Sequence, residues 1–329
     1  FTLNNPTKPG YTFSGWALSR LNGEKPSSGI ITTVLTIEKG STGDREYTTY
    51  WIANTDTKYT VEHYTENLDG TYKLEDTMQL AGQTDKEVTA QENTYEGFTL
   101  DLTNENTVQT GIVTADGNLV LKLYYTRNAY TLTLVAGDNI ASVNGAQNTV
   151  TGEYKYEEQI DITAQIQETE GYTTTFEIWE SDREELISNM TQVDNTITMP
   201  LGDVTLTAKA NKTINTYGYT IEYYYDGELD ASKTENKTAE YASIIDTYTD
   251  NLIAGYELDR VENNPLTITI DETANVMKVY YKTITYNLTY ILNGGTLENE
   301  NPSTYKVTTP TFTLNNPTKP GYTFSGWAL

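Results

Sequence analysis

The side chains that could do chemistry in this sequence are few. His63 is the only histidine among 329 residues, and there is no cysteine. A histidine that acts as a base or binds a metal needs partner side chains fixed around it. In a second segment of similar sequence, the place of His63 within VEHY is taken by Tyr223 within IEYY. We therefore interpret His63 as a structural aromatic residue on the surface of a strand.

Neighbouring acidic residues are the second candidate. Glu157-Glu158, and Asp182 with Glu184-Glu185, could supply the paired carboxylates of a glycoside hydrolase. That reaction needs two carboxyl groups about 5 to 9 Å apart in a cleft. The chain carries 46 acidic residues, so such neighbours arise by chance. Small β domains rarely enclose a cleft, and we interpret these residues as solvated surface.

Metal and phosphate sites have no motif here. The stretch AGDNIASVNG contains Asp138 and Asn139 but lacks the alternating oxygen ligands of a calcium loop. The glycines lie singly in turns, and no glycine loop ends in Lys-Ser or Lys-Thr. We assign no catalytic, cofactor-binding or metal-binding residue, no cofactor and no enzymatic activity. The sequence identifies no ligand-binding residue.

The 27 tyrosines include runs that could stack on sugar rings. Because strand residues alternate between two faces, we expect half of each run to lie in a core. We interpret Trp16 and Trp179 as core residues. Trp179 ends an apolar run and should be mostly buried. The runs are Tyr50-Trp51, Tyr124-Tyr125 and Tyr223 to Tyr225.

Charge and hydropathy exclude two kinds of partner. The formal net charge is -25 at pH 7, which repels nucleic-acid phosphates and anionic lipid surfaces. No apolar run reaches the roughly 18 residues of a membrane-spanning helix. We expect no nucleic-acid partner and no membrane insertion in this segment. No secretion signal or wall-sorting tail is visible.

The elements that position these residues are repeated. FTLNNPTKPGYTFSGWAL occupies residues 1–18 and recurs at residues 312–329, an offset of 311 residues. Within this period a glycine followed by an aromatic residue precedes each of several strand-like runs, which indicates four domains per period. These glycine anchors are Gly10, Gly97, Gly171, Gly255 and Gly321.

Composition and turns predict a mainly β fold, α+β at most. Tyrosine and threonine are frequent in alternating runs, and turns such as Asp69-Gly70 suit hairpins. Only DREELISN, residues 182–189, has a helical pattern, and it is at most a short connector. We predict domain boundaries near residues 56, 128, 213 and 284. The resulting segments are 1–56, 57–128, 129–213, 214–283 and 284–329, in which the first and last are parts of a split domain.

Short motifs in these segments resemble two known families. YTVEHYTENLDGTYKL in 57–128 and YTIEYYYDGELDASK in 214–283 resemble each other, and both segments resemble MucBP (mucin-binding-protein) repeats. EGYTTTFEIW and ITMPLGDVTLTAKA in 129–213 are similar to a divergent Listeria–Bacteroides (internalin B-repeat) domain. NGG and PTKPGYTFSGW give the split domain the same resemblance. The resemblance implies tandem β-grasp-like domains in an elongated rod, with the first and last strands of each domain parallel and adjacent.

The same resemblance implies a function. It indicates a stalk or filament segment of a repetitive, adhesin-type surface protein of a Gram-positive bacterium, extracellular and wall-anchored through regions outside this sequence. Its partners would be successive copies of the repeat, and Tyr286–Leu292 would pair with Tyr47–Ala53 of the next copy. The alternative is a carbohydrate- or mucin-binding module that recognises host or cell-surface glycans or proteins.

Overall fold

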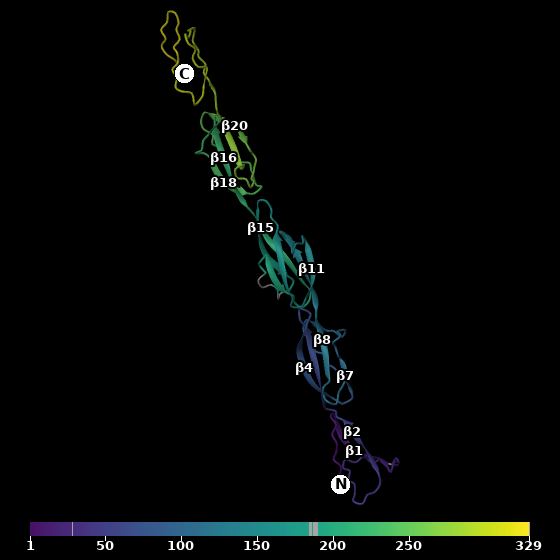
Figure 1. The fold of residues 1–329 in the computed structure, drawn as a ribbon. Coiled ribbons are helices and arrows are strands. Elements are labelled where there is room, and N and C mark those ends of the chain that lie inside the picture. The colour runs from purple at the N-terminus through teal and green to yellow at the C-terminus, as the bar shows by residue number, and fades with distance from the viewer. Residues whose placement is uncertain (28, 184–185, 187–189, 329) are drawn as a thin grey trace. The chain divides into compact units, whose positions relative to one another are not determined.

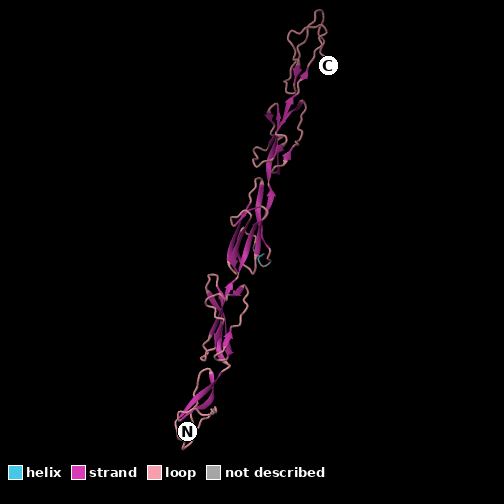
Figure 2. Ribbon diagram, turned by 90° about the vertical axis from the view of Figure 1, so that its right-hand side faces the viewer, coloured by secondary structure: helices cyan, strands magenta, loops and turns pink. Residues whose placement is uncertain are grey.

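Strands dominate the computed structural model, which describes residues 1–27, 29–183, 186 and 190–328 (Figures 1 and 2). These residues form 24 β-strands and no α-helix, so the predicted mainly β fold is confirmed. It follows that no helix in the described ranges is long and apolar enough to cross a bilayer. Most of the predicted connector helix at 182–189 lies outside the described residues.

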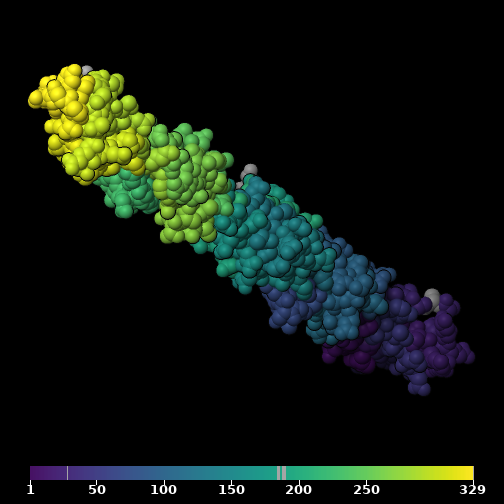
Figure 3. Space-filling model, turned by 90° about the horizontal axis from the view of Figure 1, so that it is seen from above, coloured from purple at the N-terminus to yellow at the C-terminus, as the bar shows by residue number. Residues whose placement is uncertain are grey.

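Contacts divide the chain into two compact units. Unit 1 comprises Phe1–Ala136, Ser142–Ala164 and Trp179–Ala208, and unit 2 comprises Gly137–Ala141, Gln165–Ile178 and Lys209–Leu329. The surface of each unit can be followed by residue number in Figure 3. Every sheet described below takes its strands from one predicted segment. The segment boundaries themselves remain a prediction.

Residues 57–128 form a four-stranded sheet in the order β4-β3-β8-β6. The central strand β3 (Thr57–Glu66) is antiparallel to β4 (Tyr72–Gly82) and parallel to β8 (Val120–Arg127), which is antiparallel to β6 (Phe98–Leu100). Strands β3 and β8 alternate buried and less buried residues, as expected for strands with one face on a core. The core includes Val61, Leu121, Leu123 and Tyr125. A small second sheet pairs β5 (Glu87–Thr89) with β7 (Thr110–Ile112).

Residues 216–283 repeat this arrangement. Strand β16 (Thr216–Tyr225) is antiparallel to β17 (Glu228–Leu229) and β18 (Glu235–Glu240), and parallel to β22 (Val276–Thr283). Strand β20 (Tyr256–Glu262) is antiparallel to β22. The two segments that resemble each other in sequence therefore share one sheet order. The second small sheet is again present, with β19 (Ile244–Ile245) paired to β21 (Leu266–Thr267).

The intervening segment has two sheets. One has the order β11-β9-β15-β13, built from β9 (Ala129–Ala136), β11 (Thr149–Lys155), β13 (Tyr172–Ser181) and β15 (Val204–Ile214). Strand β9 is antiparallel to β11 and parallel to β15. Trp179 on β13 is 1% exposed, which confirms its predicted burial. The other sheet has the order β10-β12-β14, with strands Ile140–Val143, Gln159–Ile166 and Asp194–Thr198.

One order of strands is thus common to the three segments. The second strand pairs with the first, the first pairs in parallel with the last, and the last pairs with the strand that follows the glycine anchor. Parallel pairing of first and last strands is the feature that the β-grasp resemblance implied.

The terminal segments each contain half of this order. In residues 1–56, the N-half, β1 (Tyr11–Leu21) is antiparallel to β2 (Arg45–Ala53). In residues 284–329, the C-half, β23 (Tyr286–Asn287) is antiparallel to β24 (Thr304–Tyr305). Of the predicted strand Tyr286–Leu292, only Tyr286 and Asn287 form a strand in the structure.

Candidate functional site: the joints between consecutive segments

A small hydrogen-bonded assembly, here called a joint, recurs where one segment meets the next. At residue 128 the backbone carbonyl of Gly97 accepts from the N–H of Asn128, at 2.8 Å. The side-chain oxygen of Asn128 accepts from the Thr99 hydroxyl at 2.7 Å. The carbonyl of Asn128 accepts from the N–H of Tyr156 in the following segment, at 2.8 Å. One linker residue is therefore held by both segments.

The same bonds form at two other places. At residue 54, Asn54 donates to Gly10 at 2.9 Å and accepts from Thr12 at 2.7 Å and from the N–H of Thr84 at 2.9 Å. At residue 215, the partners of Asn215 are Gly171, Thr173 and Tyr241, at 2.9, 2.7 and 2.9 Å. All members of each joint lie in one compact unit. The glycine anchors therefore do more than begin a strand.

The glycine also lets the next segment approach closely. A Cβ on Gly97 would lie 2.1 Å from the Tyr156 ring, and a Cβ on Gly171 would lie 2.1 Å from the Tyr241 ring. Both distances are far below a van der Waals contact, and both glycines have positive φ. Only glycine fits this position without displacing the tyrosine.

Among the described residues, a fourth joint keeps the bond to the glycine anchor but not the backbone bond from the following segment, and its side chains differ. The N–H of Ile284 donates to the carbonyl of Gly255 at 2.8 Å, and a Cβ on Gly255 would lie 2.6 Å from Val307. Glu257 stands where the other joints have threonine, and Ile284 stands where they have asparagine. The two polar partners are thus replaced together, as expected if each is used mainly by the other.

Side chains around the joints add polar contacts between segments. Arg127, whose side chain is 8% exposed, pairs with Glu157 at 2.6 Å and donates to the Tyr156 carbonyl at 2.8 Å. Lys155 pairs with Glu66 at 2.8 Å. Charge-assisted bonds to a nearly buried guanidinium are stronger than exposed ion pairs.

Two other joints use a tyrosine and a carboxylate instead. Tyr11 donates to Asp85, and Tyr241 donates to Glu170 at 3.2 Å. Each hydrogen bond raises the pKa of the tyrosine hydroxyl involved. The phenol therefore stays protonated, and able to donate, at any neutral pH.

His63 lies in a core and not on a strand surface, which corrects the sequence interpretation. Its side chain is fully buried, and its Nδ1 lies 3.1 Å from the Tyr125 hydroxyl. Burial lowers the pKa of the imidazole. Register places it opposite Leu123, as Tyr223 is opposite Val279, so His63 and Tyr223 are equivalent. The alternating residues of this strand predict two different faces. The sequence alone does not show which of the two faces packs on the core.

The acidic candidates have structural contacts. Glu158 accepts from the Lys155 N–H at 2.8 Å, and Asp182 accepts from the Thr205 N–H at 2.9 Å. Asn139 donates to the carbonyl of Ala210 at 2.8 Å. Glu184 and Glu185 lie outside the described residues. No group of three metal-binding side chains occurs in the part of the chain that the structure describes.

The aromatic runs are divided between core and surface. Tyr223 is fully buried, and its hydroxyl donates to Glu235 at 2.9 Å. Tyr224 stacks on Tyr280 with ring centroids 4.7 Å apart, and Tyr64 stacks on Tyr124 at the same distance in the equivalent segment. Trp16 is only partly buried.

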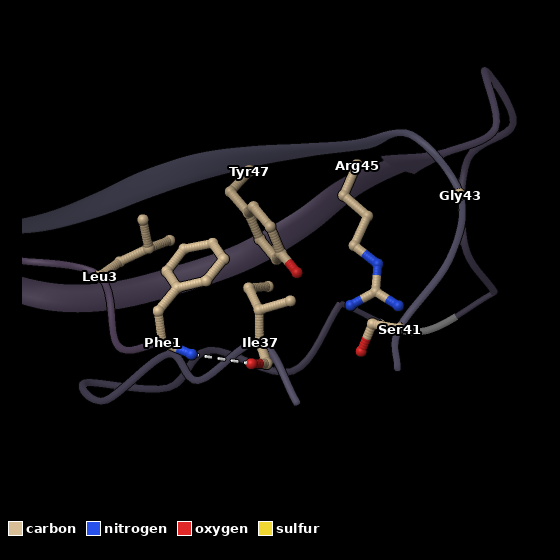
Figure 4. A pocket seen from close by; sticks show the side chains of 7 residues that line it. All are labelled: Phe1, Leu3, Ile37, Ser41, Gly43, Arg45 and Tyr47. Atoms are coloured by element: carbon tan, nitrogen blue, oxygen red, sulfur yellow. Dashed lines mark hydrogen bonds between the residues drawn. The ribbon is translucent and has the colours of Figure 1, made fainter. Parts of the chain in front are cut away.

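A shallow pocket of about 270 Å³ lies in the N-half (Figure 4). The rings of Phe1 and Tyr47 lie close together beside Ile37 and Leu3, and the lining combines these apolar side chains with polar groups. Phe1 is 78% exposed despite these neighbours. The remaining lining residues are Ser41, Gly43 and Arg45.

Comparison with known protein families assigns three of the five segments to a repeat type. Residues 1–36 and 286–329 match the Listeria-Bacteroides repeat domain, and residues 130–212 match the divergent InlB B-repeat domain. These segments are repeats of the B-repeat type. The B-repeat matches indicate a bacterial surface repeat protein. They cover both halves of the split segment and the segment between β9 and β15, so each of the four joints connects a B-repeat segment to its neighbour.

Other comparisons are weaker. A search of curated protein sequences gave no match. Among solved structures, the chain is similar to the Bacillus anthracis TIE protein, with 11% identity and a TM-score of 0.32 over 86% of this chain and 67% of that one. It is also similar to two B repeat units of the Staphylococcus aureus collagen binding protein, with 14% identity and a TM-score of 0.14 over 84% of this chain and 95% of that one.

The joint was missed by sequence reasoning, although a signal was present. Thr12, Thr99 and Thr173 each lie two residues after a glycine anchor, and an asparagine lies within two residues of each of the first three predicted boundaries. The paired change to Glu257 and Ile284 in the fourth copy is the observation that could have linked the two positions.

Proposed function

We propose that this chain is a non-catalytic stalk segment of a bacterial surface protein, which projects or links surfaces. The observation that carries the proposal is the joint, which is complete at three boundaries between segments and reduced at a fourth. A flexible spacer has no need for such an assembly, because glycine- and serine-rich linkers supply reach without it. A stalk that must keep each segment in a fixed orientation relative to the next does need such an assembly.

The strand order suits a load-bearing role. In the segment at 57–128, tension enters at the start of β3 and leaves at the end of β8, and these strands are parallel neighbours over Thr60–Thr65 and Val120–Tyr125. Pulling the two ends apart shears the ladder, so several hydrogen bonds must fail together. Without cysteine, this backbone pairing is the source of resistance in place of disulfides.

The finer assignment follows the family resemblance. We propose that residues 57–128 and 214–283 are MucBP-type domains, that the protein is extracellular and that regions outside this chain anchor it to a Gram-positive cell wall. The B-repeat matches and the acidic surface, which keeps crowded stalks apart, support an adhesin-type setting.

Single-molecule force spectroscopy tests the load-bearing role. The segment at 57–128 is pulled within the full chain, first through its own ends and then through an attachment on β6, which peels strands from the sheet one at a time. The proposal expects a clearly higher unfolding force through the native ends. Equal forces in the two geometries would contradict it. A reproducible ligand on a glycan array would favour a binding module instead.

A further inference from the structure

A tyrosine hydroxyl ties the loop before the glycine anchor to the last strand in the two segments of similar sequence. On β8, the hydroxyl oxygen of Tyr125 accepts from the N–H of Asn93 at 2.9 Å. On β22, the hydroxyl oxygen of Tyr281 accepts from the N–H of Asn251 at 3.0 Å. Each asparagine lies four residues before its anchor. The position of the loop therefore depends on this hydroxyl in both segments.

The two hydroxyls differ in the group that accepts their hydrogen. The Tyr281 hydroxyl donates to the carboxylate of Asp250 at 2.7 Å. The Tyr125 hydroxyl lies 3.1 Å from Nδ1 of His63, and no other acceptor for its hydrogen is present among the described residues. Since the Tyr125 oxygen already accepts from Asn93, Nδ1 of the neutral imidazole accepts the hydroxyl hydrogen, and Nε2 carries the hydrogen of the ring. The loop in this segment is therefore held through an acceptor that a proton can remove.

The groups that face the imidazole come from β4, β8 and the loop. On β4, Asp76 is opposite His63 in the register, and it accepts from the Tyr95 hydroxyl at 2.6 Å. On the loop, Tyr95 lies edge-on to the ring. On β8, burial, aided by the charge of Glu92, raises the pKa of Tyr125, so this phenol stays protonated. Burial lowers the pKa of His63 and the Asp76 charge opposes this shift, so the ring is neutral at pH 7 and takes up a proton in mild acid.

Protonation of His63 breaks this arrangement. The imidazolium carries a hydrogen on both nitrogens, so Nδ1 becomes a donor. The Tyr125 hydroxyl then has to turn its hydrogen away, and within the described contacts no second acceptor receives it. The new positive charge also lies in a core in which Nε2 is buried without a hydrogen-bond partner. The hydroxyl and the ring are both satisfied only if water enters, and therefore only if a neighbouring element moves.

The loop is the element that can move. Residues 91–95 belong to no strand, and side chains make most of the hydrogen bonds that hold them, those of Tyr125, Asp76 and Gln109. Strands β3 and β8, by contrast, pair over six consecutive residues of each strand. Segments with few backbone hydrogen bonds open at a lower free energy than paired strands. Water therefore reaches His63 most easily past the loop.

The loop leads directly into the joint at residue 128. The Tyr95 carbonyl accepts from the N–H of Phe98 at 3.1 Å, which closes the turn that contains Gly97. The Gly97 carbonyl accepts from Asn128, and the Tyr156 ring of the next segment packs against this glycine. A movement of the loop therefore displaces a residue to which the joint is bonded.

We propose that protonation of His63 releases residues 91–96 from Tyr125 and thereby loosens the joint at residue 128. Mild acid then weakens the connection between this segment and the one that follows. The loop beside Tyr281 stays in place, because a carboxylate, and not an imidazole, accepts the hydrogen of that hydroxyl. This response to pH is independent of the proposed stalk role.

NMR of the full chain between about pH 7.5 and pH 5 tests the proposal, because His63 is the only histidine and its ring gives a single titration curve. The amide resonances of Asn93, Asn128 and Tyr156 should shift with the midpoint of that curve. Their protection from hydrogen exchange should fall about tenfold more than that of the β8 amides. The amide of Asn251 should not respond. A ring that stays neutral down to about pH 5, a ring that titrates without these shifts, or an equal loss of protection in β8 would overturn the proposal.

Two substitutions separate the release of the loop from a general effect of acid. His63→Gln supplies a side-chain carbonyl that accepts the Tyr125 hydrogen at every pH, so the Asn93 amide should no longer respond to acid. Tyr125→Phe removes the hydroxyl, so this amide should show at neutral pH the loss that the unsubstituted chain shows in acid. Tyr281→Phe is the matched control and should expose Asn251 but not Asn93. Unchanged protection of Asn93 in Tyr125→Phe, or a persistent acid response in His63→Gln, would contradict the proposal.

Discussion

At the scale of single residues, His63 shows how a segment accommodates a polar ring in its core. The imidazole stacks on Tyr125 at 5.8 Å and lies edge-on to Tyr95 at 6.2 Å. The hydroxyl of Tyr95 in turn donates to Asp76 at 2.6 Å. In the equivalent segment the same position holds Tyr223, which makes hydroxyl hydrogen bonds of its own. The site is thus structural, and its occupant affects how stability depends on pH.

His63 should make its segment sensitive to mild acid. Burial lowers the pKa of His63 below its ordinary 6.5, although the Asp76 charge opposes the shift. The unfolded chain then binds the proton more readily, so stability is full above about pH 6.5 and falls as the pH drops, by at most about 1.4 kcal/mol per pH unit. Hydrogen exchange of the β3 and β8 amides between about pH 7.5 and pH 5 measures this fall.

His63→Tyr is the matched control, because tyrosine occupies the equivalent position. This variant should lose the pH dependence above about pH 5. The carboxylates of Asp69, Asp101 and Asp116 have lowered pKa values and contribute only at more acidic pH. An unaltered fall in the variant would show that His63 is not its source.

Burial at this scale was only partly predictable. The burial of Trp179 was predicted correctly, because this residue ends a run of apolar side chains that share one face of the strand, and such a face packs on a core. The prediction for His63 was wrong. Its neighbours Glu62 and Tyr64 do not distinguish the two faces of the strand, because tyrosine and histidine occur both on surfaces and in cores. The covered face packs against Val88, Ala90 and Val113, which lie outside this sheet, and their sequence does not show which face they cover.

At the scale of elements, the joint links strands that belong to different segments. The sequence predicted the glycine anchors and the strands that follow them. It did not predict the contacts of Gly97 with Tyr156, because those depend on the turn after β11, in which Glu157 has positive φ. Contacts that depend on the relation between two folded segments leave no periodic signal.

Gly97→Ala should disrupt the second joint. Alanine at this φ of +79° costs about 1 to 2 kcal/mol in backbone strain, and its Cβ also forces the Tyr156 ring away. Gly70→Ala is the matched control, because φ is +82° there and nothing lies within 4 Å. Only Gly97→Ala should shift the NMR resonances of Tyr156 and its neighbours. Similar effects of the two substitutions on Tyr156 would argue against the close approach.

Thr99 and Asn128 should be coupled. Removing either side chain, by Thr99→Val or Asn128→Ala, should cost about 1 kcal/mol, and the double variant should cost little more than either single one. Hydrogen exchange of the Asn128 and Tyr156 amides measures the local free energy of opening. Asn118→Ala, in an exposed turn of the same segment, should show no coupling to Thr99. Additive losses in the Thr99 and Asn128 pair would mean that their hydrogen bond contributes nothing.

At the scale of the whole molecule, the sequence is most informative about repetition. The 311-residue offset, the number of segments and the mainly β fold follow from patterns that each repeat carries locally. The strand pairing of residues 11–18 does not, since β1 is paired along its length with β2, which lies 24 or more residues further along the chain.

The joint is the central claim, and the distance distribution across it is the most direct test. Because the chain has no cysteine, spin labels can be attached at Thr77→Cys on β4 and Thr151→Cys on β11, both exposed and both in unit 1. Pulsed electron resonance should give one narrow distribution, which broadens when Gly97→Ala, Thr99→Val and Asn128→Ala are combined. A distribution in the unmodified joint that is already as broad as in the triple variant would contradict the account.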